Sequence, residues 1–441
     1  MTRPTTTNIK KNWKGWLSAL LCLTVFWGCL FPYRAVLNYH EQRHLFRWTG
    51  YYFREQWAAD GGWWEYVVSF ITQFFYVDWL GAAVVALLAW ALQRLTWWCM
   101  RLIRLRWSWL YPLSLLPSLL LFYYVFIPKE YRTDNKVREA VDYDYLVRKG
   151  KWDDILRKSY NHPPKTANGV WSTNYALAKK GTLLDMMFHY KQIGPDGLLM
   201  DAVRMEPLAL YSLSDIAWEI GLVNSAERFA FDAKQRLPNN HKSGRLYQRL
   251  AEVNLVNGNY PVARKYMKIL QSTLFYGSWA RKHKSYLNDE HLIDTDEKYG
   301  MLRSFRQKEN DELAYAKEQM LEELTTENPN NHLAADYLMA YKLLRLNMED
   351  VTRLTLTATN RQQQRVPRAI QECIAGYWIL FHPNDSLPIP IDKSVYETTI
   401  QFLQIVNSTG NRQHPSLDTP PYNETYWHYH GWATTQLRQG Q

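Results

Sequence analysis

The residues whose spacing best suits chemistry are two histidines and a glutamate in the segment HEQRH, residues 40–44. On a helix, an H-E-x-x-H pattern places both imidazoles on one face as zinc ligands and leaves the glutamate as a general base. His40 and His44 are therefore candidate ligands, with Glu41 as the base and Glu65 as a distant third ligand. The hypothesis that follows is a membrane zinc metallopeptidase.

Three features of the sequence oppose this hypothesis. The motif of zinc proteases prefers uncharged residues between its ligands, whereas Arg43 is charged, and no further zinc-protease signature follows. The segment also comes directly after a long apolar run, where amphipathic interfacial helices commonly carry charged side chains. We therefore favour an interfacial role for His40 and His44, and we expect neither catalysis nor a bound metal.

No other motif indicates a reaction. The chain has no phosphate-binding loop, no G-x-S-x-G nucleophile elbow and no dinucleotide-binding fingerprint. His428 and His430 alternate with aromatic residues, a pattern that predicts an aromatic core with polar tips. The four cysteines lack the spacing of metal ligands, and Cys373 stands far from the other three. We therefore expect no cofactor.

Three apolar stretches near the N-terminus are the strongest structural signal. Residues 15–33 and 107–127 carry no charge, and residues 66–93 carry only Asp78. About 20 apolar residues in a helix cross the hydrocarbon layer of a bilayer. The pattern predicts three transmembrane helices, at about 15–33, 75–94 and 107–127, within a membrane anchor of residues 1–127. The lipid bilayer is thus the first expected partner.

The distribution of basic residues predicts the orientation of this anchor. Two segments are basic and free of acids: the N-terminal tail and the loop between the second and third spans. They contain Arg3, Lys10, Lys11, Lys14, Arg94, Arg101, Arg104 and Arg106. Positively charged loops stay in the cytoplasm, so the N-terminus is expected inside and residues 128–441 outside. In a bacterium this places the chain in the inner membrane with a periplasmic domain.

The distribution of charge along the chain argues against a nucleic-acid partner. Residues 1–127 hold twelve Lys and Arg against five Asp and Glu, so +7 of the overall charge of +10 lies in the anchor. Nucleic-acid binding requires a basic stripe on a soluble face. The residues after 127 contain no such stripe.

A hairpin pattern recurs after the anchor. A helical run is followed by a glycine, a short polar turn and a second helix with small residues. The turn glycines are Gly150, Gly181, Gly221 and Gly258. Glycine suits the left-handed conformation that ends the first helix of such a pair. The pattern predicts an all-α domain of stacked helical hairpins.

Two of these units resemble the tetratricopeptide repeat. The matching positions are Gly221, Ala226, Phe229, Ala233 and Pro238 in one unit, and Ala251, Gly258, Tyr260, Ala263 and Leu270 in the next. The first-helix Trp and the Leu-Gly pair of the repeat are missing. The overall plan also resembles an uncharacterised family of bacterial multi-pass membrane proteins with a repeat-containing C-terminal domain.

The resemblance implies a domain organisation and an α-solenoid fold. Tetratricopeptide-like repeats are expected over 128–273, an irregular insertion over 274–308, and degenerate repeats with a C-terminal helix over 309–441. First helices of such repeats line a concave groove that holds a peptide or a partner's tail. By the spacing of the family, the groove residues are Tyr211, Ser212, Asp215, Trp218, Glu219, Arg245, Gln248, Arg249 and Glu252.

These expectations combine into one preferred function. The protein is expected to be a membrane-anchored scaffold that displays a helical-repeat domain outside the membrane for a protein or peptide partner. Envelope assembly or a transport complex is the expected setting. Zinc content separates this function from the metallopeptidase hypothesis.

Overall fold

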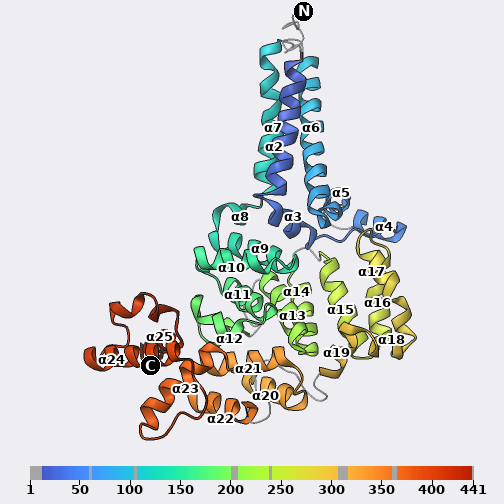
Figure 1. The fold of residues 1–441 in the computed structure, drawn as a ribbon. Helices are drawn as coiled ribbons and strands as arrows, with labels where there is room; N and C mark the ends of the chain where they lie inside the picture. The colour runs from blue at the N-terminus through green and yellow to red at the C-terminus, as the bar shows by residue number, and fades with distance from the viewer. Residues whose placement is uncertain are drawn as a thin grey trace, which may run out of the picture. The chain divides into compact units, whose positions relative to one another are not determined.

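The structure is a computed structural model that describes residues 12–58, 62–103, 107–199, 207–237, 241–305, 316–359 and 365–439. Every regular element among these residues is a helix, and no strand occurs among them. Arg3, Lys10, Lys11, Arg104, Arg106 and Pro238 lie outside these residues. Figure 1 shows the helices, coloured along the chain from the N-terminus to the C-terminus. The chain divides into two compact units. Unit 1 comprises 1–145, 234–255 and 259–290, and unit 2 comprises 146–233, 256–258 and 291–441.

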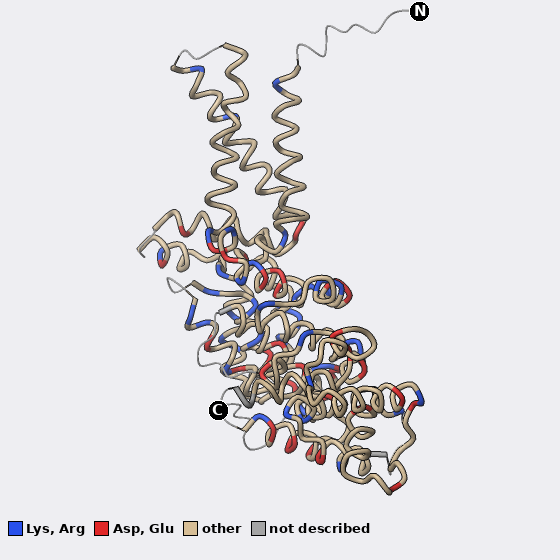
Figure 2. The backbone as a smooth tube through the Cα atoms, turned by 90° about the vertical axis from the view of Figure 1, so that its left-hand side faces the viewer, with Lys and Arg blue, Asp and Glu red and all other residues tan. Residues whose placement is uncertain are grey.

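Three apolar helical segments form a bundle in unit 1. They are α2 (Trp13–Leu30), α6 (Asp78–Leu102) and the segment Ser108–Phe126, and each is long and apolar enough to cross a membrane. Large apolar side chains stay exposed along them, as they would in lipid. Charged residues are almost absent from the length of the bundle (Figure 2). The structure confirms that three helices have the length and hydropathy needed to span a membrane. The second helix extends further than predicted, to Leu102.

The third segment is not a uniform α-helix. It consists of a 3₁₀ helix, η2 (Ser108–Leu115), then α7 (Leu116–Leu121) and a short π-helix, η3 (Phe122–Phe126). Pro112 lies inside η2 and Pro117 at the start of α7. Proline lacks the N–H that an α-helix needs and clashes with the preceding turn, which accounts for the change of helix type.

A buried polar network joins the three segments. Ser18 Oγ lies 2.9 Å from Gln93 Oε1 and 2.6 Å from the hydroxyl of Tyr111. Gln93 Nε2 donates to Ser114 Oγ at 2.8 Å. Where lipid replaces water, such bonds between helices satisfy polar groups that have no other partner. The network therefore fixes how α2, α6 and the third segment face one another.

The remaining elements of unit 1 are shorter helices. They are α3 (Arg34–Glu41), α4 (Gly50–Ala58), α5 (Gly62–Thr72), η1 (Gln73–Tyr76), α8 (Lys129–Thr133), α16 (Tyr260–Gln271), α17 (Tyr276–Lys282) and η8 (His283–Leu287), with most of α9 (Asn135–Arg148) and α15 (Gly244–Val256). Asp144 on α9 is fully buried. Its carboxylate accepts hydrogen bonds from Gln42 and from Arg245 on α15, at 2.7 and 2.9 Å.

Unit 2 contains most of the predicted hairpin region. Its elements are α10 (Trp152–Asn161), α11 (Ala167–Lys179), α12 (Leu183–Met186), η4 (Met187–His189), η5 (Pro195–Gly197), α13 (Pro207–Ile220), α14 (Val223–Gln235), α19 (Glu297–Phe305), α20 (Lys317–Glu327), α21 (His332–Leu344), α22 (Met348–Thr359), α23 (Arg368–Phe381), α24 (Lys393–Thr409), η9 (Pro415–Asp418), η10 (Tyr422–Glu424) and α25 (Tyr426–Gln439). Consecutive helices pack together in the pairs α10–α11, α20–α21, α22–α23 and α23–α24.

The four turn glycines adopt the predicted conformation. Gly150, Gly181, Gly221 and Gly258 have φ between 62° and 102°. After each of them, the next N–H bonds to the carbonyl five residues back at 2.8–2.9 Å, which caps the first helix. A fifth turn of the same type, between α21 and α22, places Leu346 at φ 61°. The glycine pattern missed that turn because its residue carries a side chain.

The compact units cut across the predicted domain boundaries. Residues 234–255 and 259–290 group with the membrane helices, whereas the earlier hairpins group with the C-terminal part of the chain. The segment 274–308, predicted as irregular, forms α17, η8, α18 (Glu290–Asp294) and α19 over most of its length. All four elements are short, so no long apolar periodicity marked them in the sequence.

Candidate functional site

The HEQRH segment does not form the helical face that its spacing suggested. Helix α3 ends at Glu41, so His44 lies beyond the helix. His40 is held elsewhere, since its Nε2–H donates to the carbonyl of Phe126 at 2.7 Å. The buried Glu41 accepts a hydrogen bond from the hydroxyl of Tyr276 at 2.7 Å. The structure therefore does not bring His40, Glu41 and His44 together as two ligands and a base.

His44 instead lies beside Glu65 and a third residue, His241. One potential ligand atom from each of the three lies within 4.8 Å of the other two. His241 Nε2 is 3.5 Å from Glu65 Oε2, and the two imidazole rings are 4.5 Å apart between centroids. We call these three residues the His44 cluster. Sequence analysis missed His241 because it lies almost two hundred residues from His44 and belongs to no local motif.

Burial controls the charge of the two imidazoles. It lowers the pKa of His44 to about 3, and the neighbouring His241 adds to this effect. Burial also lowers the pKa of His241, although the carboxylate of Glu65 acts in the opposite direction. Both rings are therefore neutral near pH 7, with a carboxylate beside them. Neutral imidazole is the form that ligates metal ions.

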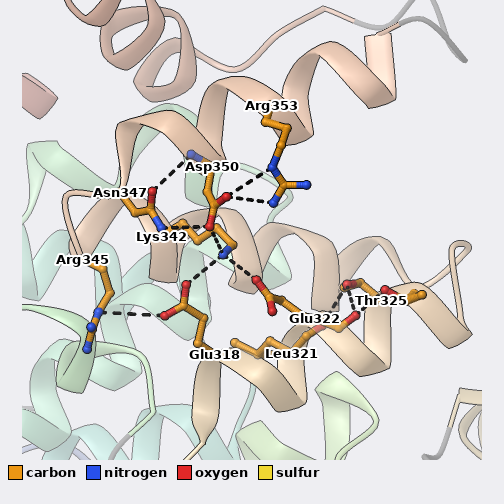
Figure 3. A network of polar contacts seen from close by, with 10 residues as sticks. Glu318, Leu321, Glu322, Thr325, Lys342, Arg345, Asn347, Asp350 and Arg353 are labelled. Carbon is orange, nitrogen blue, oxygen red and sulfur yellow. Dashed lines mark hydrogen bonds and ion pairs between the residues drawn. The ribbon is translucent and has the colours of Figure 1, made fainter.

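A second group of acidic residues lies in unit 2, where a lysine already supplies the cation (Figure 3). Glu318 and Glu322 on α20 and Asp350 on α22 offer oxygens within 4.8 Å of one another. The fully buried ammonium of Lys342, on α21, bonds to these three carboxylates at 2.8, 2.6 and 2.8 Å. All three hydrogens of an ammonium are thereby used. This lysine cage joins three helices and leaves no place for a metal.

The predicted groove residues of α13 are mostly buried. Tyr211, Ser212 and Trp218 have almost no exposed surface, whereas Asp215 is half-buried. Glu219 forms ion pairs with Lys179 at 2.8 Å and with Lys298 at 3.6 Å. Most of these side chains therefore pack inside unit 2 and do not line an exposed groove.

The predicted groove residues of α15 belong to unit 1 and make contacts within it. Arg245 pairs with Asp144 at 2.9 Å. Gln248 and Arg249 both donate to the carboxylate of Glu252, each at 3.0 Å. Most of the residues predicted from the family spacing to line a groove are therefore buried or paired with other residues of the protein. Those on α13 belong to unit 2, and those on α15 belong to unit 1.

Unit 2 contains a pocket of about 290 Å³ that sequence analysis did not predict. Its walls come from η4 with the residues after it, from η10 and from α25: Phe188, His189, Tyr190, Lys191, Gln192, Asn423, Thr425, His428, Tyr429 and Trp432. We call it the aromatic pocket. The YWHYHGW segment supplies much of one wall. Its His428 lies 2.9 Å from Asp418, while His430 packs against the rings of Tyr426 and Trp427.

Two polar atoms lining or bordering the aromatic pocket are buried without a hydrogen-bond partner in the described part of the chain. They are Nδ1 of His189 and Oδ1 of Asn423. Nε2 of His189 lies 3.3 Å from the carboxylate of Glu424. This contact favours the proton on Nε2 and leaves Nδ1 as an acceptor. The pocket thus combines aromatic walls with two acceptors that lack a donor.

Comparison with known proteins identifies a family without an assigned activity. The chain matches the family of unknown function DUF6057 over residues 9–132 and 125–431, and it therefore belongs to that family. No curated protein matches the chain. No solved structure matches it either.

Proposed function

We propose that this member of the DUF6057 family is a membrane-anchored binding protein. Its helical-hairpin domain, which resembles tetratricopeptide repeats, holds a peptide segment of a protein partner outside the membrane. The observation that carries the proposal is the aromatic pocket in unit 2, in a chain whose first part has three helices of membrane-spanning length. Binding, rather than catalysis, suits a pocket whose lining residues include no paired nucleophile and base.

The chemistry of the aromatic pocket suits a peptide. Aromatic walls favour one apolar or aromatic side chain, the kind of anchor that supplies most binding energy at interfaces. The acceptors of His189 and Asn423 suit backbone N–H groups beside that anchor. A buried polar group without a partner costs about 1–3 kcal/mol, so a ligand that supplies the donor gains affinity.

The membrane placement of the proposal is a bacterial inner membrane. Lys14, on α2, and Arg101, at the end of α6, belong to the acid-free segments, and the Lys14 ammonium lies 4.7 Å from the ring centroid of Trp97 on α6. One end of the bundle is therefore basic. Positively charged ends stay in the cytoplasm, so the N-terminus is cytoplasmic and residues 128–441 are periplasmic in this proposal.

Site-specific photocrosslinking in intact cells tests the binding function. A photoreactive benzophenone residue at Trp432, inside the pocket, is expected to give a discrete adduct with one partner. The matched position is Phe231 on α14, which is 40% exposed and does not line the pocket. Crosslinking there is expected to give no such adduct.

A second change separates pocket binding from chance proximity. Asn423→Leu keeps the branched shape of the side chain and removes the acceptor. In the Trp432 crosslinking variant it is expected to reduce the adduct several-fold, because the partner's N–H loses its bond. An adduct of unchanged yield, or an equal adduct from position 231, would contradict the proposal.

A further inference from the structure

The His44 cluster is a second feature of chemical interest, and it lies in unit 1. Its residues come from three separate elements: the loop after α3, the first turn of α5 and the segment just before α15. Each is half-buried. Nδ1 of His241 is buried without a hydrogen-bond partner among the described residues, and Nε2 lies 3.5 Å from the carboxylate of Glu65. A buried ring nitrogen without a partner is costly unless a ligand bonds to it.

The spacing of the cluster matches a metal site. Four ligands placed tetrahedrally at about 2.0–2.1 Å from zinc lie roughly 3.3 Å from one another. His241 Nε2 and Glu65 Oε2 are 3.5 Å apart, and all three ligand atoms lie within 4.8 Å of one another. Small rotations of the side chains therefore suffice to close the three atoms around an ion.

The polypeptide around the cluster is already held in position. Arg245, four residues after His241, donates to Gln42 at 2.5 Å, and Gln42 lies two residues before His44. Lys242 pairs with Glu55 on α4 at 2.9 Å. These bonds tie the segment before α15 to α4 and to the loop after α3. The two histidines are thus brought together by neighbouring contacts, so a metal would not have to assemble the site.

One nearby charge opposes a cation, and it is directed elsewhere. The guanidinium of Arg43 lies 4.9 Å from the ring centroid of Tyr39 and donates to the hydroxyl of that residue. His40 does not compete as a ligand, because its Nε2 is bonded to Phe126. The carboxylate of Glu65 supplies the negative charge that the cluster needs.

From this geometry we propose that His44, Glu65 and His241 bind a divalent transition-metal ion, with zinc as the natural probe. Two imidazoles and one carboxylate are a ligand set of zinc and of other first-row metals. Three protein ligands leave at least one coordination position for water or for a group of a bound partner. The inference is independent of the aromatic pocket. Because His40 and Glu41 are bonded to other residues, zinc at this site does not restore the HEQRH peptidase, and zinc content alone no longer separates that hypothesis from the binding function.

Metal titration of the full-length protein in detergent tests the proposal. Protein stripped with a chelator is expected to take up one zinc per chain, retained through gel filtration, and to melt at a higher temperature with zinc than without. Cobalt in place of zinc is expected to give visible absorption from a site of low coordination number. A chain that retains no stoichiometric zinc overturns the proposal.

Three variants identify the ligands. Glu65→Gln and His241→Gln are each expected to weaken zinc binding by at least about tenfold, since even indirect contacts to a metal are worth 10–100-fold. His332→Gln, at an exposed histidine of α21, is the matched control and is expected to bind zinc as the parent does. Unchanged zinc binding in both ligand variants would place the metal elsewhere and overturn the assignment.

Folding of the variants is checked independently of the metal. Glu65→Gln keeps the shape of the side chain, so its melting temperature in chelator should stay close to that of the parent protein. Loss of the zinc-induced increase in melting temperature, with an unchanged metal-free value, separates a ligand role from a structural one.

Discussion

Lys342 shows how one residue can determine the packing of three helices. Its ammonium is completely buried, and all three of its partners are carboxylates on neighbouring helices. The three carboxylates are 26–44% exposed, so water partly screens the charges that remain when the lysine is removed. Hydrogen bonds to charged groups contribute about 1.5–3 kcal/mol, so we expect Lys342→Met to lower the free energy of unfolding by about that amount, measured by chemical denaturation of the full chain.

An exposed lysine provides the control for this change. Lys393 on α24 has a side chain that is 89% exposed and lies 3.7 Å from Glu397. Surface pairs of this kind contribute about 0–1 kcal/mol, so Lys393→Met should have little effect. Equal effects of the two substitutions would show that the lysine cage does not hold α20, α21 and α22 together.

Asp336 on α21 gives a prediction for the dependence of stability on pH. Burial raises the pKa of this carboxyl to about 6, from 3.8 for an exposed one. The folded protein therefore binds this proton more tightly than the unfolded chain does. The contribution is fully present below pH 3.8 and is lost as the pH rises through about 6, above which the buried charge opposes folding.

Replacing the carboxyl with an amide should remove this cost. We expect Asp336→Asn to stabilise the protein by about 1–3 kcal/mol at pH 7.5 and to change little at pH 4. Thermal unfolding at the two pH values measures the difference. Glu349→Gln, at an exposed carboxyl of α22, is the control and should change the stability little. A gain for Asp336→Asn that is the same at both pH values would rule out titration as its source.

At the scale of the element, the hairpin turns depend on backbone conformation. Gly181 has φ 67°, and a Cβ added there would meet no atom within 4 Å. Any cost of adding a side chain is therefore strain in the backbone, which is roughly 1–2 kcal/mol for a left-handed residue. We expect Gly181→Ala to destabilise the protein by about that amount, as measured by denaturant unfolding.

Gly50, at the start of α4, provides a control that separates the effect of a positive φ from the effect of adding a side chain. It also has no atom within 4 Å of an added Cβ, but its φ is not positive. Gly50→Ala should be neutral or slightly stabilising, because alanine restricts the unfolded chain. Similar losses at both positions would mean that the turn conformation is not the cause.

Helices and turns were predictable where a short stretch of sequence carries the pattern that specifies them. Long uncharged runs identified the three membrane-length helices, and glycines identified four hairpin turns. Leu346 escaped prediction because it adopts a left-handed conformation, φ 61°, without being a glycine. The proline-containing third segment was recognised as a span, but its mixture of helix types depends on contacts that hydropathy does not report.

Neither the His44 cluster nor the aromatic pocket could be assembled from local pattern. The cluster joins His44 to His241, and the pocket joins residues 188–192 to the C-terminal helix. Both require knowledge of which distant segments pack together, which a single sequence does not contain. The HEQRH motif includes His44, which the structure places beside Glu65 and His241. It failed for His40 because α3 ends before the motif is complete.

At the scale of the whole molecule, charge separates the anchor from the rest of the chain. The acid-free segments lie before Gly15 and between residues 94 and 106, whereas the loop after the first span mixes acids and bases. Translocation depends on Lys and Arg in short segments beside the spans and little on Asp and Glu. The two basic segments are therefore expected to remain on the same side of the membrane.

In the proposed topology, three crossings place the C-terminus on the opposite side of the membrane from the N-terminus, and reporter fusions test this arrangement. A phosphatase that is active only outside the cytoplasm should be active when fused after Gln441 and inactive when inserted near Arg101, in the loop after α6. A fluorescent protein that matures only inside should show the reverse pattern at both positions. Replacing Arg94, Arg101, Arg104 and Arg106 with Gln should weaken this preference, because positively charged residues beside a span favour a cytoplasmic loop. Cytoplasmic activity of the reporter fused after Gln441 would invert the orientation and place the aromatic pocket inside the cell.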